Sequence, residues 1–173
     1  MGVKGDQVFK DDIIIKYRGL YDYDGLMALI RDFFAKEKID LEEPKMKYNM
    51  KKTGAEVEFK FQGDRKVSYF IRVYLYVEGH IWDADPKEMT IDGKKVMRTG
   101  GKLQLFLNAS YEPDFRKRFS KKNKVHRWMK RHIQDPDTGL QYNDIKTLGK
   151  SFMQKKLWEL DGKIKQFLGM ECY

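Results

Sequence analysis

Hydrophobic and polar positions alternate along this chain with two different periods, and the changes between them mark the predicted elements. Residues 8–18, which include three consecutive isoleucines, predict a first strand. From Leu26 to Phe34 the apolar residues recur at helical spacing instead. Asp22 or Asp24 lies where a side-chain oxygen can accept hydrogen bonds from the free N–H groups of a helix start. The pattern therefore predicts a strand followed by a helix with one buried face.

Beyond Pro44 the period drops to two. Apolar residues at 46, 48 and 50 alternate with lysine and asparagine, and those at 57, 59 and 61 alternate with glutamate and lysine. Such alternation is typical of half-buried strands, because successive side chains point to opposite faces of a sheet. The two segments predict a hairpin joined near Thr53 and Gly54.

The strongest predicted strand spans residues 66–78 and is apolar on both faces. One face carries Val67, Tyr69, Ile71, Val73, Leu75 and Val77. The opposite face carries Phe70, Tyr74 and Tyr76 around Arg72. A strand of this kind is either covered on two sides within its own chain or has one face on a partner. We therefore predict that Phe70, Arg72, Tyr74 and Tyr76 form an interaction face.

The last predicted strands follow the turn signals. Asp92 and Gly93 predict a tight type I′ turn between 89–91 and 94–97. The segment 99–101 predicts a break, and a further strand over 103–111 is expected to end at Pro113. The remainder predicts two helices: one over about 120–134, and a longer one whose apolar stripe contains Ile145, Leu148, Phe152, Leu157, Leu160, Ile164, Phe167 and Leu168.

Assembled, these elements predict an α+β fold. A strand and a helix are followed by a four- to five-stranded antiparallel meander sheet, which packs against two C-terminal helices. The 173 residues contain no internal repeat and fit one domain over residues 1–173. In element order alone the chain resembles helix-grip ligand-binding folds, and this resemblance implies no ligand.

Composition favours a soluble globular protein. The hydrophobic fraction of 41%, with 14% aromatic residues, excludes a disordered chain, and 35% charged residues predict a highly charged surface. One cysteine, Cys172, excludes an intramolecular disulfide and favours a reducing compartment. No apolar stretch reaches the roughly 20 residues of a spanning helix, and no signal region is evident. We expect an intracellular or virion protein.

The positive charge is concentrated in one segment. The net charge is +9, and nine cations without any Asp or Glu lie between positions 116 and 132: Arg116, Lys117, Arg118, Lys121, Lys122, Lys124, Arg127, Lys130 and Arg131. Such a segment predicts contact with a polyanion, which is an acidic protein surface, a nucleic acid or membrane headgroups. The alternative is a solvated face, or one paired with acidic residues of the same chain. The segment lacks aromatic residues free for base stacking, since its own are expected to dock the helix on the sheet.

No set of residues predicts catalysis, a cofactor or a metal. His80 and Trp82 would share one face of a strand while Asp83 lies on the other, and Asp85 before Pro86 favours a turn. His126 and His132 are six residues apart, which does not place two ligands on one helical face. Phosphate-loop and nucleophile-elbow patterns are absent from the sequence. These observations favour a protein without enzymatic activity.

Two stretches carry a resemblance to a known family. They are the residues Gly19–Leu26 (GLYDYDGL) ahead of the predicted helix and His80–Asp83 (HIWD) after the long strand. With the charged, aromatic strands between them, they resemble a family of small uncharacterised archaeal proteins over residues 13 to 135. The family has no established activity, so the resemblance implies no catalytic residue.

Three functions stay open at this point. The first is a structural or assembly subunit of a larger cellular or viral complex, whose sheet contacts other subunits or copies of itself and whose basic helix contacts an acidic partner. The second is a free-standing nucleic-acid-binding module. The third is a small-molecule carrier or enzyme with a pocket between sheet and helix, lined by Tyr74, Trp82 or Phe106.

Overall fold

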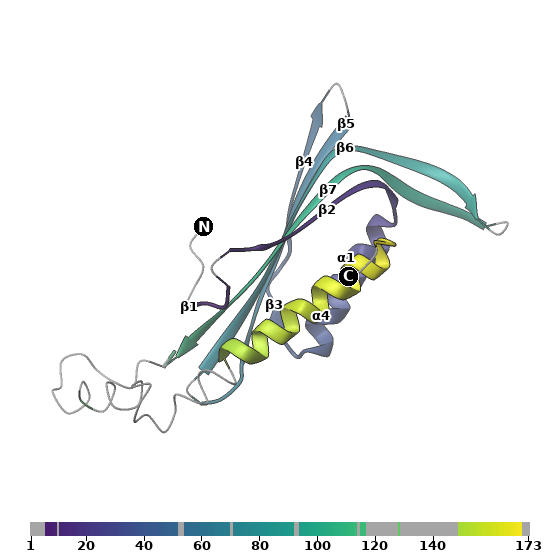
Figure 1. Ribbon diagram of the computed structural model, residues 1–173. Helices are drawn as coiled ribbons and strands as arrows, with labels where there is room; N and C mark the ends of the chain where they lie inside the picture. Colours follow the sequence, from purple (N-terminus) through teal and green to yellow (C-terminus); the bar gives the residue numbers. More distant parts are fainter. Residues whose placement is uncertain are drawn as a thin grey trace.

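The computed structural model describes residues 6–9, 11–51, 54–69, 71–91, 94–113, 115–116, 128 and 149–170 (Figure 1). Its elements follow one another as β1 (Asp6–Gln7), β2 (Ile13–Tyr21), α1 (Tyr23–Lys36), β3 (Asp40–Leu41), β4 (Lys45–Lys51), β5 (Gly54–Lys66), β6 (Ile71–Ile91), β7 (Lys94–Pro113) and α4 (Phe152–Phe167). The mixture of a sheet with helices confirms the predicted α+β class.

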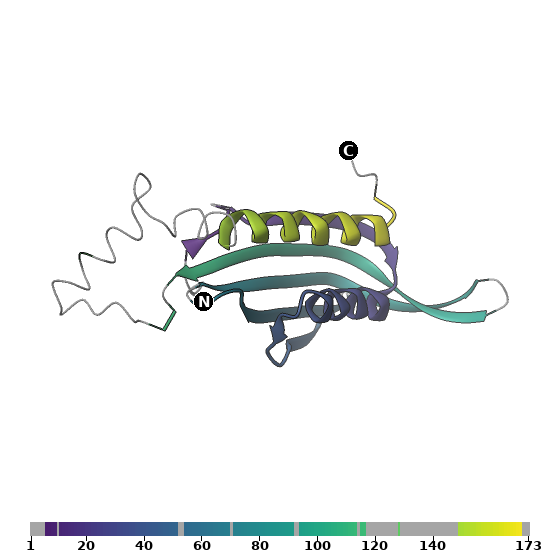
Figure 2. The same cartoon turned by 90° about the horizontal axis from the view of Figure 1, so that it is seen from below.

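The seven strands of the described residues belong to one antiparallel sheet. Its order is β1-β7-β6-β5-β3, with β2 also pairing with β7 and β4 also pairing with β5. Both helices lie on the same side of the sheet, as the two perpendicular views show (Figure 1, Figure 2). The opposite side, which we call the outer face, carries no helix among the described residues.

Helix α1 begins where the sequence predicts it. The Asp22 carboxylate accepts a hydrogen bond from the Gly25 N–H at 2.9 Å and so satisfies one of the free donors of the first turn. The apolar stripe of the helix is buried against the sheet through Leu26, Met27, Ile30, Phe33 and Phe34. Its capping and periodicity therefore agree, and both confirm the prediction.

The core lies between this helix pair and the inner face of the sheet. Alternate residues of β6, from Ile71 to Ile81, point inward and are fully or almost fully buried. The C-terminal helix buries Met153, Leu157, Leu160 and Ile164 on the same core. Burial of each such side chain contributes on the order of 1.5–3 kcal/mol. Of the predicted stripe, Leu157, Leu160, Ile164 and Leu168 are buried and Phe152 is partly buried, which confirms these positions. Phe167 is 38% exposed, against the prediction, and Ile145 and Leu148 lie outside the described residues.

The predicted sheet of four to five strands is too small. Two of the seven strands, β1 and β3, are only two residues long, and such short strands leave no alternation to detect. The first predicted strand, β2, also joins the same sheet by pairing with β7 along its whole length. The predicted helix over 120–134 falls on residues that lie outside the described part.

The segment 66–78, predicted to be one strand, contains the turn between β5 and β6 and the first part of β6. The structure ends β5 at Lys66 and begins β6 at Ile71, where the Ser68 hydroxyl accepts a hydrogen bond from the Ile71 N–H. Apolar residues continue to alternate through Val67 and Tyr69, so periodicity alone does not reveal this turn. Tyr69 is 77% exposed and does not belong to the core face.

Two predicted breaks are instead a β-bulge inside continuous strands. The register between β6 and β7 shifts between Trp82 and Asp85, and Asp83 adopts a φ of 54°. Gly101 opposite has a φ of 152°, and a Cβ there would lie 2.8 Å from the carbonyl oxygen of Trp82. A bulge bends a ribbon without ending it. Both strands therefore continue past Pro86 and Gly101.

Beyond the bulge, β6 and β7 form a projecting two-stranded arm. Pairing with β5 ends at Ala84, and pairing with β2 ends at Thr99. The arm comprises residues 87–91 and 94–98, and Figure 1 shows it curving away from the rest of the sheet. Its register pairs Ile91 with Lys94, as the predicted hairpin requires, and the turn residues 92 and 93 lie outside the described part.

Strand β4 is more exposed than its alternation indicates. Tyr48 and Met50 are 62% and 85% exposed, although both lie on the face that also carries the helices. Only Met46 on that face is partly buried against the core. Alternation thus identifies a strand correctly but does not guarantee that a helix layer reaches it.

In the described part of the chain, neither helix has the length and apolar character required to span a bilayer.

Candidate functional site

The outer face presents the alternate side chains of every long strand. Pairing aligns them in rows that run across β4, β5, β6, β7 and β2. One row contains Lys47, Glu58, His80, Gln104 and Lys16, and the next contains Lys45, Lys60, Glu78, Phe106 and Ile14. Polar, aromatic and cationic groups therefore share one face of the sheet.

The predicted interaction face lies on this surface, toward the end of the sheet away from the arm. Tyr74 and Tyr76 stack with ring centroids 6.4 Å apart, and both are buried, at 3% and 6% exposure. The Tyr74 hydroxyl donates to the Glu112 carboxylate at 2.7 Å. Burial, together with this acceptor, raises the pKa of Tyr74 to about 12. The two tyrosines therefore behave as packed structural groups within a single chain.

Arg72 is the more accessible member of that predicted face. Its guanidinium lies 4.7 Å from the ring centroid of Phe115 and 3.4 Å from the Asp64 carboxylate. Phe70, the fourth predicted residue, lies outside the described residues. The role of Phe70, Arg72, Tyr74 and Tyr76 in binding a partner stays a prediction.

Of the predicted polyanion-binding residues, Arg116 is the one that the structure describes. Its guanidinium lies over the rings of Tyr69 and Phe115, at 5.4 and 5.5 Å from their centroids. Cation–π contacts of this kind contribute about 0.5–1 kcal/mol at exposed sites. The other eight predicted residues lie outside the described part: Lys117, Arg118, Lys121, Lys122, Lys124, Arg127, Lys130 and Arg131. Their polyanion contact stays a prediction.

The centre of the outer face carries a polar and aromatic cluster. His80 stacks on Trp82 with ring centroids 3.9 Å apart and an angle of 24° between the planes. The imidazole Nε2 lies 2.8 Å from Glu56, and the same carboxylate pairs with Lys51. Lys51 first, and then His80, lower the pKa of Glu56. These contacts fix the rings against the sheet and hold Glu56 as an anion.

The three acid and histidine residues considered for a metal do not converge. His80 contacts Glu56, Asp83 pairs with Lys102 at 3.4 Å, and Asp85 pairs with Lys87 at 3.3 Å. At the bulge, Asp83 adopts a φ of 54°, and its carboxylate lies against Lys102, the register partner of Trp82. Within the described residues, no three metal-ligating side chains gather into one group.

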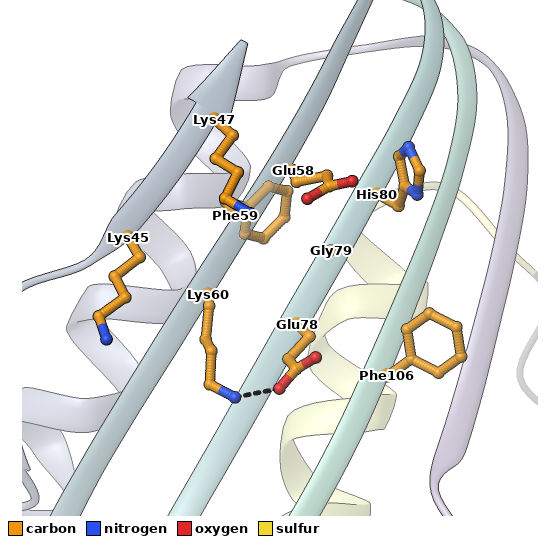
Figure 3. A pocket seen from close by; sticks show the side chains of 9 residues that line it. All are labelled: Lys45, Lys47, Glu58, Phe59, Lys60, Glu78, Gly79, His80 and Phe106. Carbon is orange, nitrogen blue, oxygen red and sulfur yellow. Dashed lines mark hydrogen bonds and ion pairs between the residues drawn. The ribbon is translucent and has the colours of Figure 1, made fainter. Parts of the chain in front are cut away.

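A shallow hollow of about 310 Å³ opens on the outer face beside this cluster (Figure 3). Lys45 and Lys47 of β4 stand on one side, and His80 and Phe106 stand on the other. Lys60 and Glu78 form an ion pair between them, and Glu58 completes the polar lining. The floor is the β6 backbone around Gly79. The hollow therefore combines cations with two flat ring surfaces.

Sequence reasoning predicted the hairpin of the arm, but it missed this hollow and the projection of the arm beyond the sheet. The rows of the outer face depend on strand register, which a single sequence does not fix between strands far apart in the chain. The Asp92-Gly93 turn signal marks the hairpin of the arm, but the apolar alternation of its strands stops near residues 83–86 and 98–101. The aromatic residues assigned to a pocket under the helices, Tyr74, Trp82 and Phe106, all belong to the outer face.

Comparison with known proteins adds no relative. A scan against protein-family models, a search of curated proteins and a search of solved structures each found no significant match to this chain. The resemblance to small archaeal proteins therefore stays a prediction. Inferences about function rest on the chemistry of the surfaces described above.

Proposed function

We propose that this chain is a non-enzymatic interaction protein, a structural or assembly subunit of a larger cellular or viral complex. In this proposal the arm contacts a neighbouring subunit, which is a second copy of the chain. The basic segment between 116 and 132 contacts an acidic partner. An intracellular or virion location belongs to the same proposal.

The observation that carries the proposal is the arm itself. From Lys87 outward it pairs with no other strand of the described sheet. An ion pair at the base of the arm joins Arg98 to Asp22, the cap residue of α1, at 3.4 Å. A two-stranded ribbon standing alone in water is marginally stable at best. Packing of the arm against a neighbouring subunit would stabilise the two-stranded ribbon.

The exposed side chains of the arm support a protein neighbour. Met97 and Met89 are 56% and 38% exposed, and the arm also carries the exposed Lys95–Glu88 pair. Methionine adapts its shape to irregular surfaces and is common where proteins bind one another. The exposed Tyr48 and Met50 of β4 supply a second apolar surface on the other projecting hairpin. The two surfaces give a heterologous contact, in which the arm of one copy meets β4 of the next.

Shortening the arm tests the proposal. Lys87 and Arg98 are partners in the register, so residues 88–97 can be replaced by Asn-Gly, which closes a two-residue type I′ turn. This change keeps the ion pair between Arg98 and Asp22. We expect wild-type protein to self-associate with rising concentration in size-exclusion chromatography with light scattering, and the shortened variant to stay monomeric.

A point variant and a matched control sharpen the test. Met97→Ser together with Met89→Ser should lower the association constant at least tenfold, because it removes the exposed apolar side chains from both faces of the arm without altering the strand register. Ile14→Ser changes another apolar residue, 49% exposed, on the outer face of β2, and should leave association unchanged. A wild-type protein that is monomeric at every concentration would overturn the self-assembly proposal.

A further inference from the structure

We propose that the outer face binds single-stranded nucleic acid, with bases on the ring surfaces of His80, Trp82 and Phe106 and phosphates against the cations of the two flanking strands. This binding site goes beyond the proposed assembly function and does not involve the arm. It also differs from the basic segment that the sequence singles out.

The charge of this surface favours a polyanion. The part of the outer face between the bulge and the row of Phe106 contains seven cations: Lys16, Arg18, Lys45, Lys47, Lys51, Lys60 and Lys102. The same part contains four carboxylates: Glu56, Glu58, Glu78 and Asp83. Each of Glu56, Glu78 and Asp83 already pairs with a lysine of this face. The excess of positive charge is therefore available to a ligand.

The cations are arranged at the margins of the aromatic centre. Strand β4 supplies Lys45 and Lys47 on one side, and strand β2 supplies Lys16 and Arg18 on the other, and all four are exposed. No ion pair is found for these four among the described residues. In a single strand each base lies beside a phosphate, so a strand that crosses the face can stack its bases on the central rings and place successive phosphates against the cations of β4 and β2.

The aromatic centre supplies stacking surfaces. Trp82 and His80 are half-buried and already lie parallel to one another, so little side-chain freedom is lost when a base stacks on them. Phe106 stands across the hollow from Lys45 and Lys47 (Figure 3). Base stacking on an aromatic side chain is worth roughly 1–3 kcal/mol per base and tolerates any sequence.

The remaining acidic groups fit the same ligand. Glu58 and Glu78 line the hollow between the lysines and the rings, where a base edge and not a phosphate would lie. A carboxylate there can accept a hydrogen bond from the exocyclic amino group of a base, as glutamate does with cytosine. An anionic membrane would engage the cations without using either the rings or these acceptors. A duplex would bury its bases away from the rings, so a single strand is the ligand that uses every group.

The direct test is fluorescence anisotropy with a labelled 20-nucleotide oligo(dC) at 50 to 200 mM salt. For about four phosphate contacts on the face, we expect the logarithm of affinity to fall with the logarithm of salt at a slope near −3. Lys45→Ala with Lys47→Ala should reduce that slope by about 1.4. The matched control is Lys150→Ala with Lys155→Ala, which removes two exposed lysines near and within α4 and should change the slope little.

A second variant tests the rings. Trp82→Ala should weaken oligo(dC) binding by a factor of roughly 5 to 150. Trp82→Phe keeps a stacking surface and should restore most of the affinity. Thermal unfolding of each variant gives its folded fraction at the temperature of the binding experiment. Affinities are compared per folded molecule, so a weaker affinity then reports the loss of the ring and not the loss of the fold.

Three outcomes would overturn the proposal. Equal affinity for a 20-base-pair duplex would exclude stacking of single-stranded bases on the rings. Loss of binding on reversal of Lys124, Arg127 and Arg131 to Glu, with no effect of the Lys45 and Lys47 changes, would assign the binding to the basic segment. Binding of phosphatidylserine vesicles in place of oligo(dC) would assign the cations to a membrane surface. Binding of oligo(dC) by the variant with the shortened arm shows that the site is independent of assembly.

Discussion

Gly79 and Gly162 lie in opposite surroundings. A Cβ at Gly79 would lie 2.1 Å from the ring of Phe59, which covers this position on the inner face of the sheet. A Cβ at Gly162 in α4 would meet no atom of another turn or element within 4 Å. Nothing in the sequence around the two glycines distinguishes these environments, because the crowding comes from a residue on a neighbouring strand.

The two glycines give a matched pair of substitutions. Gly79→Ala should destabilise the fold by about 1–3 kcal/mol, since a methyl group is forced into a packed core. Gly162→Ala should stabilise it by up to about 1 kcal/mol, because alanine is the better helix former at an uncrowded helical position. Urea denaturation of both variants measures the two free energies. Changes of the same sign would contradict this packing of β6 against Phe59.

At the scale of elements, Glu159 joins the two helices. Its carboxylate pairs with Lys163 and Lys156, each at 3.0 Å, and with Lys36 of α1 at 3.2 Å. Lys163 first, and then Lys156, hold the pKa of Glu159 at about 2. Lys156 also pairs with Glu37 at 2.8 Å. The contact between α1 and α4 is therefore electrostatic at its rim and apolar inside.

The lowered pKa of Glu159 predicts a dependence of stability on pH. An unfolded glutamate has a pKa near 4.3, so between about 4.3 and 2 the unfolded chain binds a proton that the folded chain does not. The contribution is present above that range and is lost as the pH falls through it. The melting temperature of wild type should exceed that of Glu159→Gln at pH 6, and the difference should shrink toward pH 2.

The control is the exposed ion pair on the arm. Glu88→Gln removes a carboxylate that is 55% exposed and pairs with the more exposed Lys95, at 76%. Exposed pairs of this kind contribute little, because water and salt screen them. This variant should melt within experimental error of wild type at both pH values. A difference between wild type and Glu159→Gln that does not change with pH would show that the carboxylate acts through packing alone.

At the scale of the whole molecule, the sheet has three distinct surroundings. Its inner face is covered by α1 and α4, its outer face carries no helix in the described part, and its arm extends beyond both (Figure 1, Figure 2). The bulge at Asp83 separates the arm from the outer face. Two functions assigned to these two regions can therefore be separated by mutation.

This separation is itself a testable expectation. The variant with residues 88–97 replaced by Asn-Gly should lose self-association and keep its affinity for oligo(dC) within about twofold, because the shortened arm lies beyond the rows of His80 and Phe106. The Lys45→Ala and Lys47→Ala variant should show reduced oligonucleotide binding. Light scattering and anisotropy on the same two proteins measure both properties. Loss of both properties in the arm variant would show that binding requires the assembled form.

The sequence by itself determined the local features of this protein. Periodicity and a cap at Asp22 or Asp24 predicted α1, alternation predicted β4 and the middle of β5 and β7, and the stripe around Leu157 and Leu160 predicted α4. These features depend on interactions between residues close in the chain, so a local pattern contains them. The same reasoning predicted the α+β class, because each element exposes one apolar face that another must cover.

The tertiary structure decided which faces are covered and which side chains meet. It left Met50 exposed, buried Tyr74 and Tyr76 on the outer face, turned two expected breaks into a bulge, and brought Lys47 and His80 into one row. Each of these depends on register between strands and on the reach of the helix layer. Strand register and the area of sheet that the helices cover both arise from contacts between distant parts of the chain. Alternation within one segment does not specify such contacts.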